Sequence, residues 1–306
     1  MTAVHRASAP ARACAGCLRG LVVSGVARAL GGPPGALEEY REPLGDPGLF
    51  GPGSVAWQVH ADLPAMLVGG VSSLMLQTLH PLAMAGVAEH SRYREDPFGR
   101  LQRTARFVAG TTFGSRELAD DLVAEVRAVH RRVRGVAADG RRYVASDPRL
   151  LTFVHTAEVW SFLRSYQRYG PRPLLRSEKD RYLAEVAEVA IRLGARDVPA
   201  SVDEVRAYLR EIRGELAATP DALAAIRFLR RPLGDRPVDA LGHRVVAGAA
   251  VDLLPAFARR ELRLGVVTGA RAAPVRVAAT AFAVALRWAV GPSLVLAVAT
   301  ERARAN

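Results

Sequence analysis

The stretch LHPLAMAGVAEHSRYREDPFGRLQRTARFVAGTTFG, residues 79–114, carries the strongest structural signals in the chain. It begins in an apolar run, passes two histidines, becomes highly charged and then shows arginines at helical spacing. Asp96 is a favourable N-cap residue, and Pro97 would occupy the first helical position, where proline is favoured. The sequence therefore predicts a helix that begins at Pro97 and follows an apolar helical segment.

Similar helix starts recur along the chain. They are Asp147-Pro148, Thr219-Pro220, Ser115 before Arg116, and Ser201 with Glu204 at capping-box spacing. Apolar residues recur every three or four positions, whereas period-two alternation is almost absent. We therefore predict an all-α fold, a single large helical domain of roughly eight to ten helices at usual helix and loop lengths.

Three apolar stripes predict the buried faces of three helices. They are Leu118, Leu122, Val126, Val129 and Val133; Leu151, Val154, Val159, Phe162 and Tyr166; and Val186, Val189, Ala190 and Leu193. Residues 1–45 differ, because the sequences GGPPG and EPLGDPG are rich in glycine and proline. We expect an irregular N-terminal arm over 1–45 and a helical domain over 46–306.

The net charge of +12 comes almost entirely from arginine, since Lys179 is the only lysine. The arginines are spread along the chain and do not form one basic run, which indicates a coding bias more than a nucleic-acid site. The sequence also shows no RNA-binding aromatic motif and no zinc-finger spacing. We therefore expect no nucleic-acid partner.

The two cysteines, Cys14 and Cys17, have CxxC spacing. A second pair and a strand–helix context are missing, so we interpret them as incidental thiols and not as a metal or redox site. Arginines interrupt the N-terminal region and leave no apolar signal-peptide core. We therefore expect a cytoplasmic protein.

Two apolar stretches raise the question of a membrane. Ala65–Ala88 carries no charge, but it contains Gly69-Gly70 and Pro81. Val277–Ala299 is interrupted by Arg287 and Pro292. Both stretches are long enough to span a bilayer. We interpret them as buried core helices, and the alternative is a membrane span or a weak association with a membrane surface.

The helix predicted from Pro97 has a polar face beside an apolar residue. Helical spacing puts on one face Arg100, Arg103, Thr104 and Phe107. Two arginines and a hydroxyl could hold a carboxylate or a phosphate. The alternative is a solvated arginine face that pairs with Glu95 or Asp96.

The histidines give further candidates. His130 follows Val126 on an apolar stripe, and it is either a hydrogen-bonded core residue or a ligand, such as the axial ligand of a haem iron. His155 and Glu158 have metal-ligand spacing, but no Glu-x-x-His motif accompanies them, so we predict an internal hydrogen bond between them. His80 and His90 either line a site or mark helix ends.

Several enzyme classes find no support in the sequence. It contains no GxSxG nucleophile elbow, no P-loop, no HExxH and no GxGxxG. Hydrolase, kinase and dinucleotide-binding activities therefore lack their usual motifs.

The order of the remaining segments is more informative. The chain contains, in this order, the segments HPLAMAGVAEHSRYREDP, RLQRT and FG. After them come a histidine before RVRG, then YVASDPRLLTFVHTAEVWSF, and later DLLPAFARRELRL. This order, over about residues 50–260, resembles the MpaB-like oxygenase family, which includes the latex clearing protein, a rubber oxygenase. The resemblance implies an all-α fold that encloses one haem b.

The resemblance also implies roles for residues. His130 matches the proximal iron ligand, the metal-binding residue of the site. Arg100 and Thr104 match the arginine and threonine of an R-x-x-[KR]-T motif in the haem pocket, where Phe107 is a candidate to cover the porphyrin. The rubber oxygenase has a lysine at the position of Arg103; arginine is a poor iron ligand, so the sixth position is open, holds water, or takes another side chain.

We therefore expect a haem-dependent oxygenase that uses O2 on an apolar, unsaturated substrate of isoprenoid or lipid type. The candidate catalytic residues are Arg100, Arg103 and Thr104, and Glu89 is the nearest candidate for an acid–base carboxylate. Two alternatives remain open. One is a haem- or lipid-binding protein without turnover, and the other is a membrane-associated helical interaction protein without a cofactor.

Overall fold

The computed structural model describes residues 9–31, 35–232, 236–265 and 272–305. Within them the chain forms fourteen α-helices, two short 3-10 helices and one two-stranded sheet, which confirms the predicted all-α fold. The elements are α1 (Ala9–Leu30), η1 (Glu38–Tyr40), α2 (Val55–His60), α3 (Leu63–Gln77), α4 (Pro81–His90), α5 (Pro97–Phe113), α6 (Arg116–Arg132), β1 (Arg134–Val136), β2 (Arg142–Val144), α7 (Pro148–Tyr169), α8 (Arg176–Leu193), α9 (Val202–Glu211), η2 (Ile212–Glu215), α10 (Pro220–Leu229), α11 (Pro237–Leu253), α12 (Ala256–Glu261), α13 (Ala273–Val290) and α14 (Leu294–Arg304). Helices outnumber the eight to ten expected, because several apolar stretches are broken into two helices.

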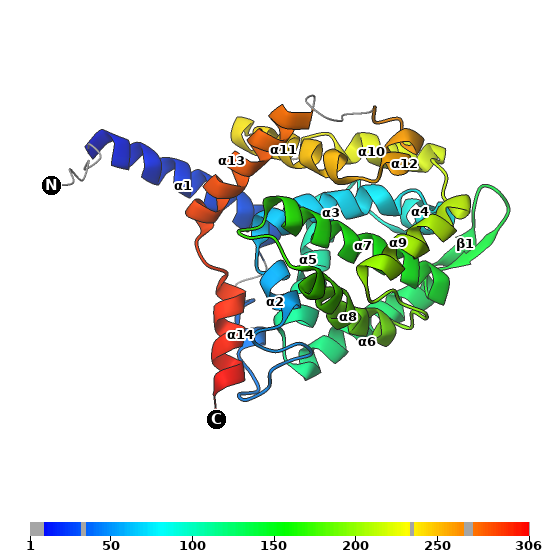
Figure 1. The fold of residues 1–306 in the computed structure, drawn as a ribbon, viewed down its shortest axis with the longest axis horizontal. Helices are drawn as coiled ribbons and strands as arrows, with labels where there is room; N and C mark the ends of the chain where they lie inside the picture. Colours follow the sequence, from blue (N-terminus) through cyan, green and yellow to red (C-terminus); the bar gives the residue numbers. More distant parts are fainter. Residues whose placement is uncertain (1–8, 32–34, 233–235, 266–271, 306) are drawn as a thin grey trace.

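The antiparallel helices α3 and α7 form the centre of the molecule (Figure 1). Gly69 of α3 lies directly against α7, where a β-carbon would stand 2.9 Å from the ring of Phe162. Eight residues farther along α3, the amide of Gln77 donates to the carbonyl oxygen of Val154, eight residues earlier on α7. The missing side chain at Gly69 therefore permits a close helix contact at the core.

The charge-free stretch Ala65–Ala88 is part of this core. Helix α3 ends at Gln77, and α4 begins at Pro81 after a bend of 106°. Ala65, Met75 and Leu79 have no exposed surface. The prediction of buried core helices is confirmed for this stretch.

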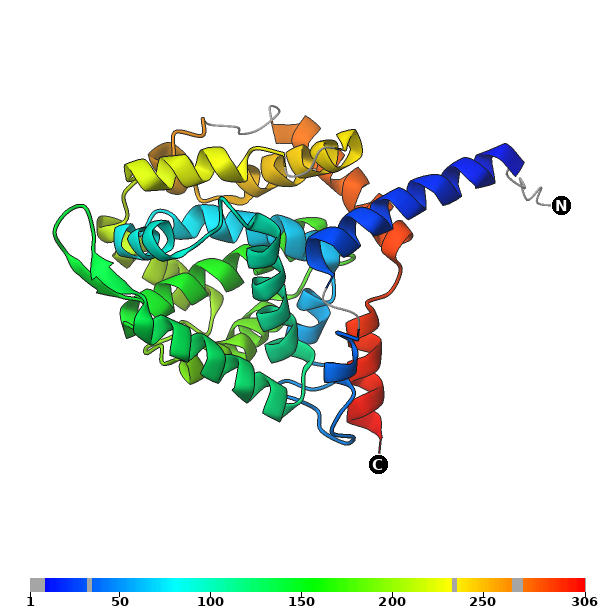
Figure 2. The ribbon, with the colours of Figure 1, turned by 180° about the vertical axis from the view of Figure 1, so that it is seen from behind.

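The other helices cover the central pair from two sides. Helices α10, α11 and α12 form a layer on one side of α3 and α7, and α6 and α8 lie on the other side (Figure 1). The view from behind shows α5 and α6 joined by a short turn, in contact near it and diverging away from it as an open helical hairpin (Figure 2). A short β-hairpin, β1 and β2, follows α6 and pairs Gly135 with Tyr143.

The predicted helix starts are confirmed. The N-cap side chain accepts a backbone N–H bond at each of these positions: Asp96, Ser115, Asp147, Ser201 and Thr219. These caps satisfy N–H groups that a helix leaves unpaired at its first turn.

The stripes on α7 and α8 are largely confirmed, and the stripe on α6 is not. Phe162 and Tyr166 are buried on α7, as are Val186 and Ala190 on α8. On α6, Leu122 is buried but Val129 is 44% exposed. Val133 lies beyond the helix end. The apolar pattern of α6 therefore continues past the point where the helix is covered.

The expected irregular arm contains a long helix. Residues 9–30 form α1, because its alanine, valine, leucine and arginine residues favour helix and GGPPG lies only after it. Gln102 of α5 donates to the carbonyl oxygen of Arg28, while the N-terminal part of α1 projects from the body (Figures 1 and 2). The side chains of Cys14 and Cys17 lie outside the described part of the structure. The division at residue 45 stays a prediction.

Helix α13 is not the buried core helix that was predicted. Only 22% of Ala273–Val290 is buried, and within the described residues it is the one helix long and apolar enough to cross a membrane. Val277, Val284 and Trp288 are 69%, 60% and 53% exposed. Their spacing of seven and four residues puts them on one face. The helix packs on α1, α3 and α11 and leaves this apolar face to solvent.

Candidate functional site

Two contacts fix the register of the α5–α6 hairpin. Gly110 of α5 lies against Leu122 of α6, and Arg106 forms an ion pair of 3.8 Å with Glu125. The helices run antiparallel with the same rise per residue, so one step back along α5 matches one step forward along α6. His130 therefore comes level with about residue 102 of α5, between Arg100 and Thr104.

Three of the four predicted site residues of α5 lie on the same helix face as the buried Thr111, and Arg103 does not. Arg100, Thr104, Phe107 and Thr111 follow one another at three- and four-residue steps. Thr111 is only 3% exposed, so this face of α5 is directed toward the interior of the molecule.

His130 belongs to the corresponding face of α6. It stands seven residues after Val123, which is 5% exposed, and four after Val126, which is half-buried. Successive residues turn by about 100° in an α-helix, so His130 points about 80° away from the direction of Leu122. Arg100 points about 80° away from the direction of Gly110 on α5, to the same side of the hairpin. The fold thus brings His130 and Arg100 to one side.

The hairpin is closed at one end and open at the other. Near its turn, Gly110 and Thr111 are buried. Toward Pro97, Thr104 is exposed although it lies on the inward face, and Val129 is exposed although it follows the Leu122 stripe. The two helices therefore do not cover each other over the half that holds the candidate residues.

The imidazole of His130 has unused bonding capacity. Its Nδ1 atom is buried and has no hydrogen-bond partner among the described residues. Burial lowers the pKa of His130, which leaves the ring neutral near pH 7. A neutral imidazole is the form that binds a metal ion.

Arg100 is a partly desolvated cation. Its Nη1 donates to the hydroxyl of Ser91 at 2.6 Å, and among the described residues no carboxylate lies within 4.0 Å of it. Burial, and next the charge of Arg103, lower the pKa of Arg100, but a guanidinium stays charged at neutral pH. An anion beside Arg100 would therefore be stabilised.

The side chains of Arg103 and Thr104 have other hydrogen-bond partners than that of Arg100. The hydroxyl of Thr104 donates to the carbonyl oxygen of Arg100 at 3.0 Å, within the helix. Arg103 lies 3.4 Å from Asp96, and its side chain is 68% exposed. For Arg103 the geometry fits the alternative of a solvated face that pairs with Asp96.

Glu89 and His90 lie at the end of α4 beside the β-hairpin. The hydroxyl of Tyr143 donates to Glu89, and the Nε2 atom of His90 lies 3.2 Å from the same hydroxyl. Burial, and next the hydrogen bond to Glu89, raise the pKa of Tyr143 to about 12. Glu89 is thus held by the strand β2, and no contact between described residues joins it to Arg100 or Thr104.

His80 and His90 do mark helix boundaries. His80 is the N-cap of α4, and His90 is its last residue. His80 is buried, and its ring centroid lies 5.1 Å from that of Phe153. Burial lowers the pKa of His80, and its Nδ1 atom lacks a partner among the described residues.

The predicted hydrogen bond between His155 and Glu158 is not formed. The Nε2 atom of His155 is buried and unpaired among the described residues. Burial lowers the pKa of His155 to about 4 and raises that of Glu158 to about 7, with no hydrogen bond or counter-charge acting on either group. Glu158 is thus a carboxylate that changes its charge near neutral pH.

No pattern in the sequence pointed to a role for His60. Its Nδ1 lies 2.7 Å from the hydroxyl of Thr112, and its Nε2 lies 3.0 Å from that of Tyr182. Burial, and next the charge of His155, lower the pKa of His60 to about 3. Its partners come from two distant helices, α5 and α8, so no local motif could announce this polar cluster inside the core.

Comparison with known proteins gives one match. Residues 57–288 match the family model of the ER-bound oxygenase mpaB/B′ and rubber oxygenase catalytic domain. No curated protein and no solved structure matches the chain. The matched region includes α5, α6 and α7, and hence every candidate residue placed above. Because this match covers most of the chain, the protein belongs to the MpaB/rubber oxygenase family and is an oxygenase, an oxidoreductase.

Proposed function

We propose that this oxygenase holds haem b, with His130 as the iron ligand, and uses O2 to oxidise an apolar, unsaturated small molecule of isoprenoid or lipid type. The observation that carries the proposal is the free, neutral imidazole of His130 on the inward side of the α5–α6 hairpin, level with Arg100. When bound, haem supplies the redox chemistry that O2 activation requires.

The donor set fits a prosthetic group better than a bare metal ion. Among the described residues, no three His, Cys, Asp or Glu side chains are placed together to hold a metal. A porphyrin brings four nitrogen ligands of its own, so one protein imidazole is sufficient. His130 meets this requirement.

Arg100 and Phe107 would hold the group. Arg100 is half-buried and lacks a carboxylate partner among the described residues, so a haem propionate would neutralise it. Phe107 lies two turns farther along the same face and offers an apolar ring against the porphyrin. Thr104 lies between them, and its hydroxyl bonds the Arg100 carbonyl oxygen within the helix.

Arg103 would leave the distal side free. Its guanidinium stays protonated, is exposed and faces Asp96. We therefore propose that Arg103 does not bind the iron, and that its contribution to the site is electrostatic. A distal position without a protein ligand would admit small exogenous ligands.

The proposed substrate class rests on the apolar segments that precede the site residues in the sequence. Small-molecule sites are mostly apolar, with a few placed polar groups. Here the apolar helices α3 and α4 precede the arginine-bearing helix α5. Apolar walls exclude water and favour a hydrocarbon chain, while Arg100 and Thr104 supply the polar groups.

Absorption spectroscopy tests the haem proposal. Protein purified with haem should show a Soret band that shifts on reduction with CO, and the ferric form should bind cyanide or imidazole. The variant His130→Ala should lose most of its haem. The matched control is His243→Gln, because His243 bonds the backbone of Leu229 far from this hairpin in sequence. A His130→Ala protein with a native Soret band and iron content would exclude His130 as the ligand.

Turnover is a separate question. Oxygen uptake should accompany oxidation of an unsaturated isoprenoid or lipid, and Arg100→Ala should lower it in folded, haem-containing protein. Wild-type haem protein that consumes no O2 with such candidates would favour a non-catalytic binding protein. A protein that takes up no haem would favour the cofactor-free alternative.

For localisation we propose a cytoplasmic protein that touches a membrane through α13. The exposed face of Val277, Val284 and Trp288 supports this proposal. Co-sedimentation with lipid vesicles should be lost in a Val284→Asn/Trp288→Gln variant. Equal sedimentation of the variant and the wild type would contradict a role for this face.

A further inference from the structure

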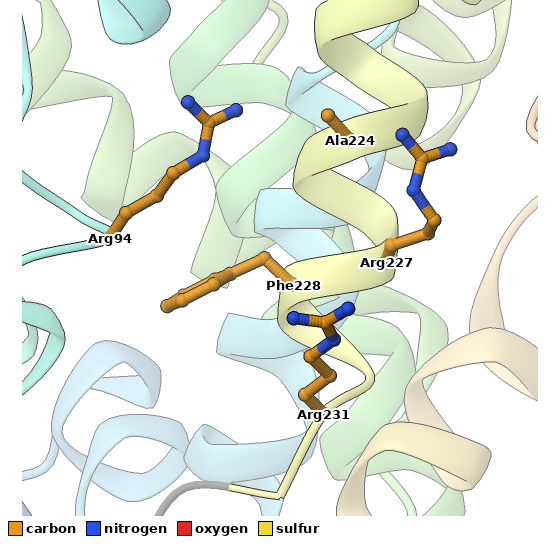
Figure 3. A pocket seen from close by; sticks show the side chains of 5 residues that line it. All are labelled: Arg94, Ala224, Arg227, Phe228 and Arg231. Carbon is orange, nitrogen blue, oxygen red and sulfur yellow. The ribbon is translucent and has the colours of Figure 1, made fainter.

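A pocket of about 360 Å³ opens on the surface beside α10. It is lined by Arg94, Ala224, Arg227, Phe228 and Arg231 (Figure 3). Arg94 comes from the loop between α4 and α5, whereas Arg227 and Arg231 come from α10 and the residues just after it. The pocket therefore joins two segments that lie far apart in the sequence.

The charge of this pocket is unbalanced. Three of its five lining residues are arginines, and among the described residues none of the three has a carboxylate within 4.0 Å. A second surface pocket, beside α6 and α8, also contains three arginines, but there Arg192 pairs with Asp120 and Glu188. Like charges held together repel one another, so the first pocket favours an anion.

The floor of the pocket is apolar and holds one of the arginines in place. The ring of Tyr93 packs edge-on against Phe228, with centroids 5.2 Å apart. The guanidinium of Arg94 lies 5.0 Å from the centroid of the same Tyr93 ring. This cation–π contact positions Arg94 before any ligand binds. An anion with an apolar stem would be complementary to both the arginines and the apolar floor of the pocket.

The pocket adjoins the proposed oxygenase site. Tyr93 is 8% exposed. It is close enough to interact electrostatically with Arg94 and with Arg100. Two residues earlier, Ser91 accepts the hydrogen bond of Arg100. The loop 91–96 thus contacts the pocket through Tyr93 and the candidate active site through Ser91.

We propose that this pocket binds the anionic head group, a carboxylate or a phosphate, of an amphipathic molecule whose apolar chain is the oxygenase substrate. Guanidinium groups bind both anions through charge-assisted, often bidentate hydrogen bonds. The assignment of the chain as substrate rests on the proposed function. Anion binding itself rests only on the pocket.

Binding measurements test the proposal directly. Oleate should bind the purified protein more tightly than oleyl alcohol, which has the same chain without the charge. Inorganic phosphate should compete with oleate, and added NaCl should weaken both. Arg227→Gln should weaken oleate binding by about tenfold, the usual scale for a lost charge-assisted contact. Arg230→Gln is the control, because Arg230 is exposed on the same helix end and does not line the pocket.

The outcomes separate this proposal from the oxygenase proposal. Equal oleate affinity in wild type and Arg227→Gln, at unchanged melting temperature, would overturn it. Binding only to vesicles of anionic lipid, without binding of oleate or phosphate, would overturn it in favour of a membrane surface. A protein that binds oleate through Arg227 but contains no haem would leave the anion site standing and refute the proposed function.

Discussion

The buried carboxyl group of Glu158 should make the stability of the protein fall as the pH rises. The pKa of Glu158 is about 7 in the folded protein, raised by burial from its ordinary value of 4.5. Between these values the folded protein keeps a proton that the unfolded chain has lost. The free energy of unfolding therefore decreases from about pH 4.5 to about pH 7 and stays lower above this window.

The magnitude follows from the two pKa values. A rise from 4.5 to about 7 spans about 2.5 pH units, each worth about 1.4 kcal/mol, which gives at most about 3.5 kcal/mol. The side chain keeps some accessible surface, and water near the carboxylate reduces the effect. We expect a loss of about 1–3 kcal/mol.

The assay compares urea unfolding of the wild type and Glu158→Gln at pH 5 and pH 8.5. Glutamine resembles the protonated form, so the variant should gain about 1–3 kcal/mol on the wild type at the higher pH and about a quarter of that at the lower. His60 and His155 have pKa values lowered to about 3 and about 4, so their contributions are lost as the pH falls below about 6.5. Both proteins share those contributions, and the difference isolates Glu158.

Glu301→Gln serves as the control, because Glu301 is exposed on α14. It should give the same difference from the wild type at both pH values. The reasoning fails if Glu158→Gln is no more stable than the wild type at pH 8.5, or if its advantage is as large at pH 5.

Two further changes test the packing. Gly69→Ala should destabilise the protein by about 1–3 kcal/mol in urea unfolding, because the new β-carbon would stand 3.0 Å from the backbone of Phe162. Gly70→Ala is the control. Its β-carbon would have its nearest contact at 3.9 Å, so this variant should be neutral or slightly stabilising. Equal effects of the two glycine variants would contradict the close contact of α3 and α7. Arg302→Met should lower stability by about 2–4 kcal/mol. Arg302 is 1% exposed, and its guanidinium donates to the carbonyl oxygens of Tyr40, Asp46 and Phe113, which would lose their partner. A melting temperature within 1 °C or so of the wild type would refute this role for Arg302.

Helix starts were predictable because caps are local. Asp96 and Asp147 bond N–H groups only two or three residues ahead, so a short stretch of sequence is enough to predict them. The shared face of Arg100, Thr104 and Phe107 was predictable for the same reason, since it depends only on helical periodicity. The order of the segments around His130 was enough to indicate the family, which the match over residues 57–288 confirms.

The apolar stretches show where such reasoning ends. Ala65–Ala88 and Val277–Ala299 have similar composition, yet the first is core and half of the residues of α13 are exposed. Hydropathy records how strongly a segment prefers burial. It does not record how many neighbours the rest of the chain provides. The predicted burial of Val129 is wrong for the same reason, because its apolar stripe continues where α5 no longer covers α6.

The sequence by itself determined the helical class, the helix starts, the family and the candidate face of α5. Only the tertiary structure decided that Glu158 is buried without a partner among the described residues, and that Arg94 and Arg227 line one basic pocket. The physical reason is the distance along the chain over which each interaction acts. Caps and periodicity act over a few residues, whereas desolvation and charge pairing depend on which distant segments the folded chain brings together.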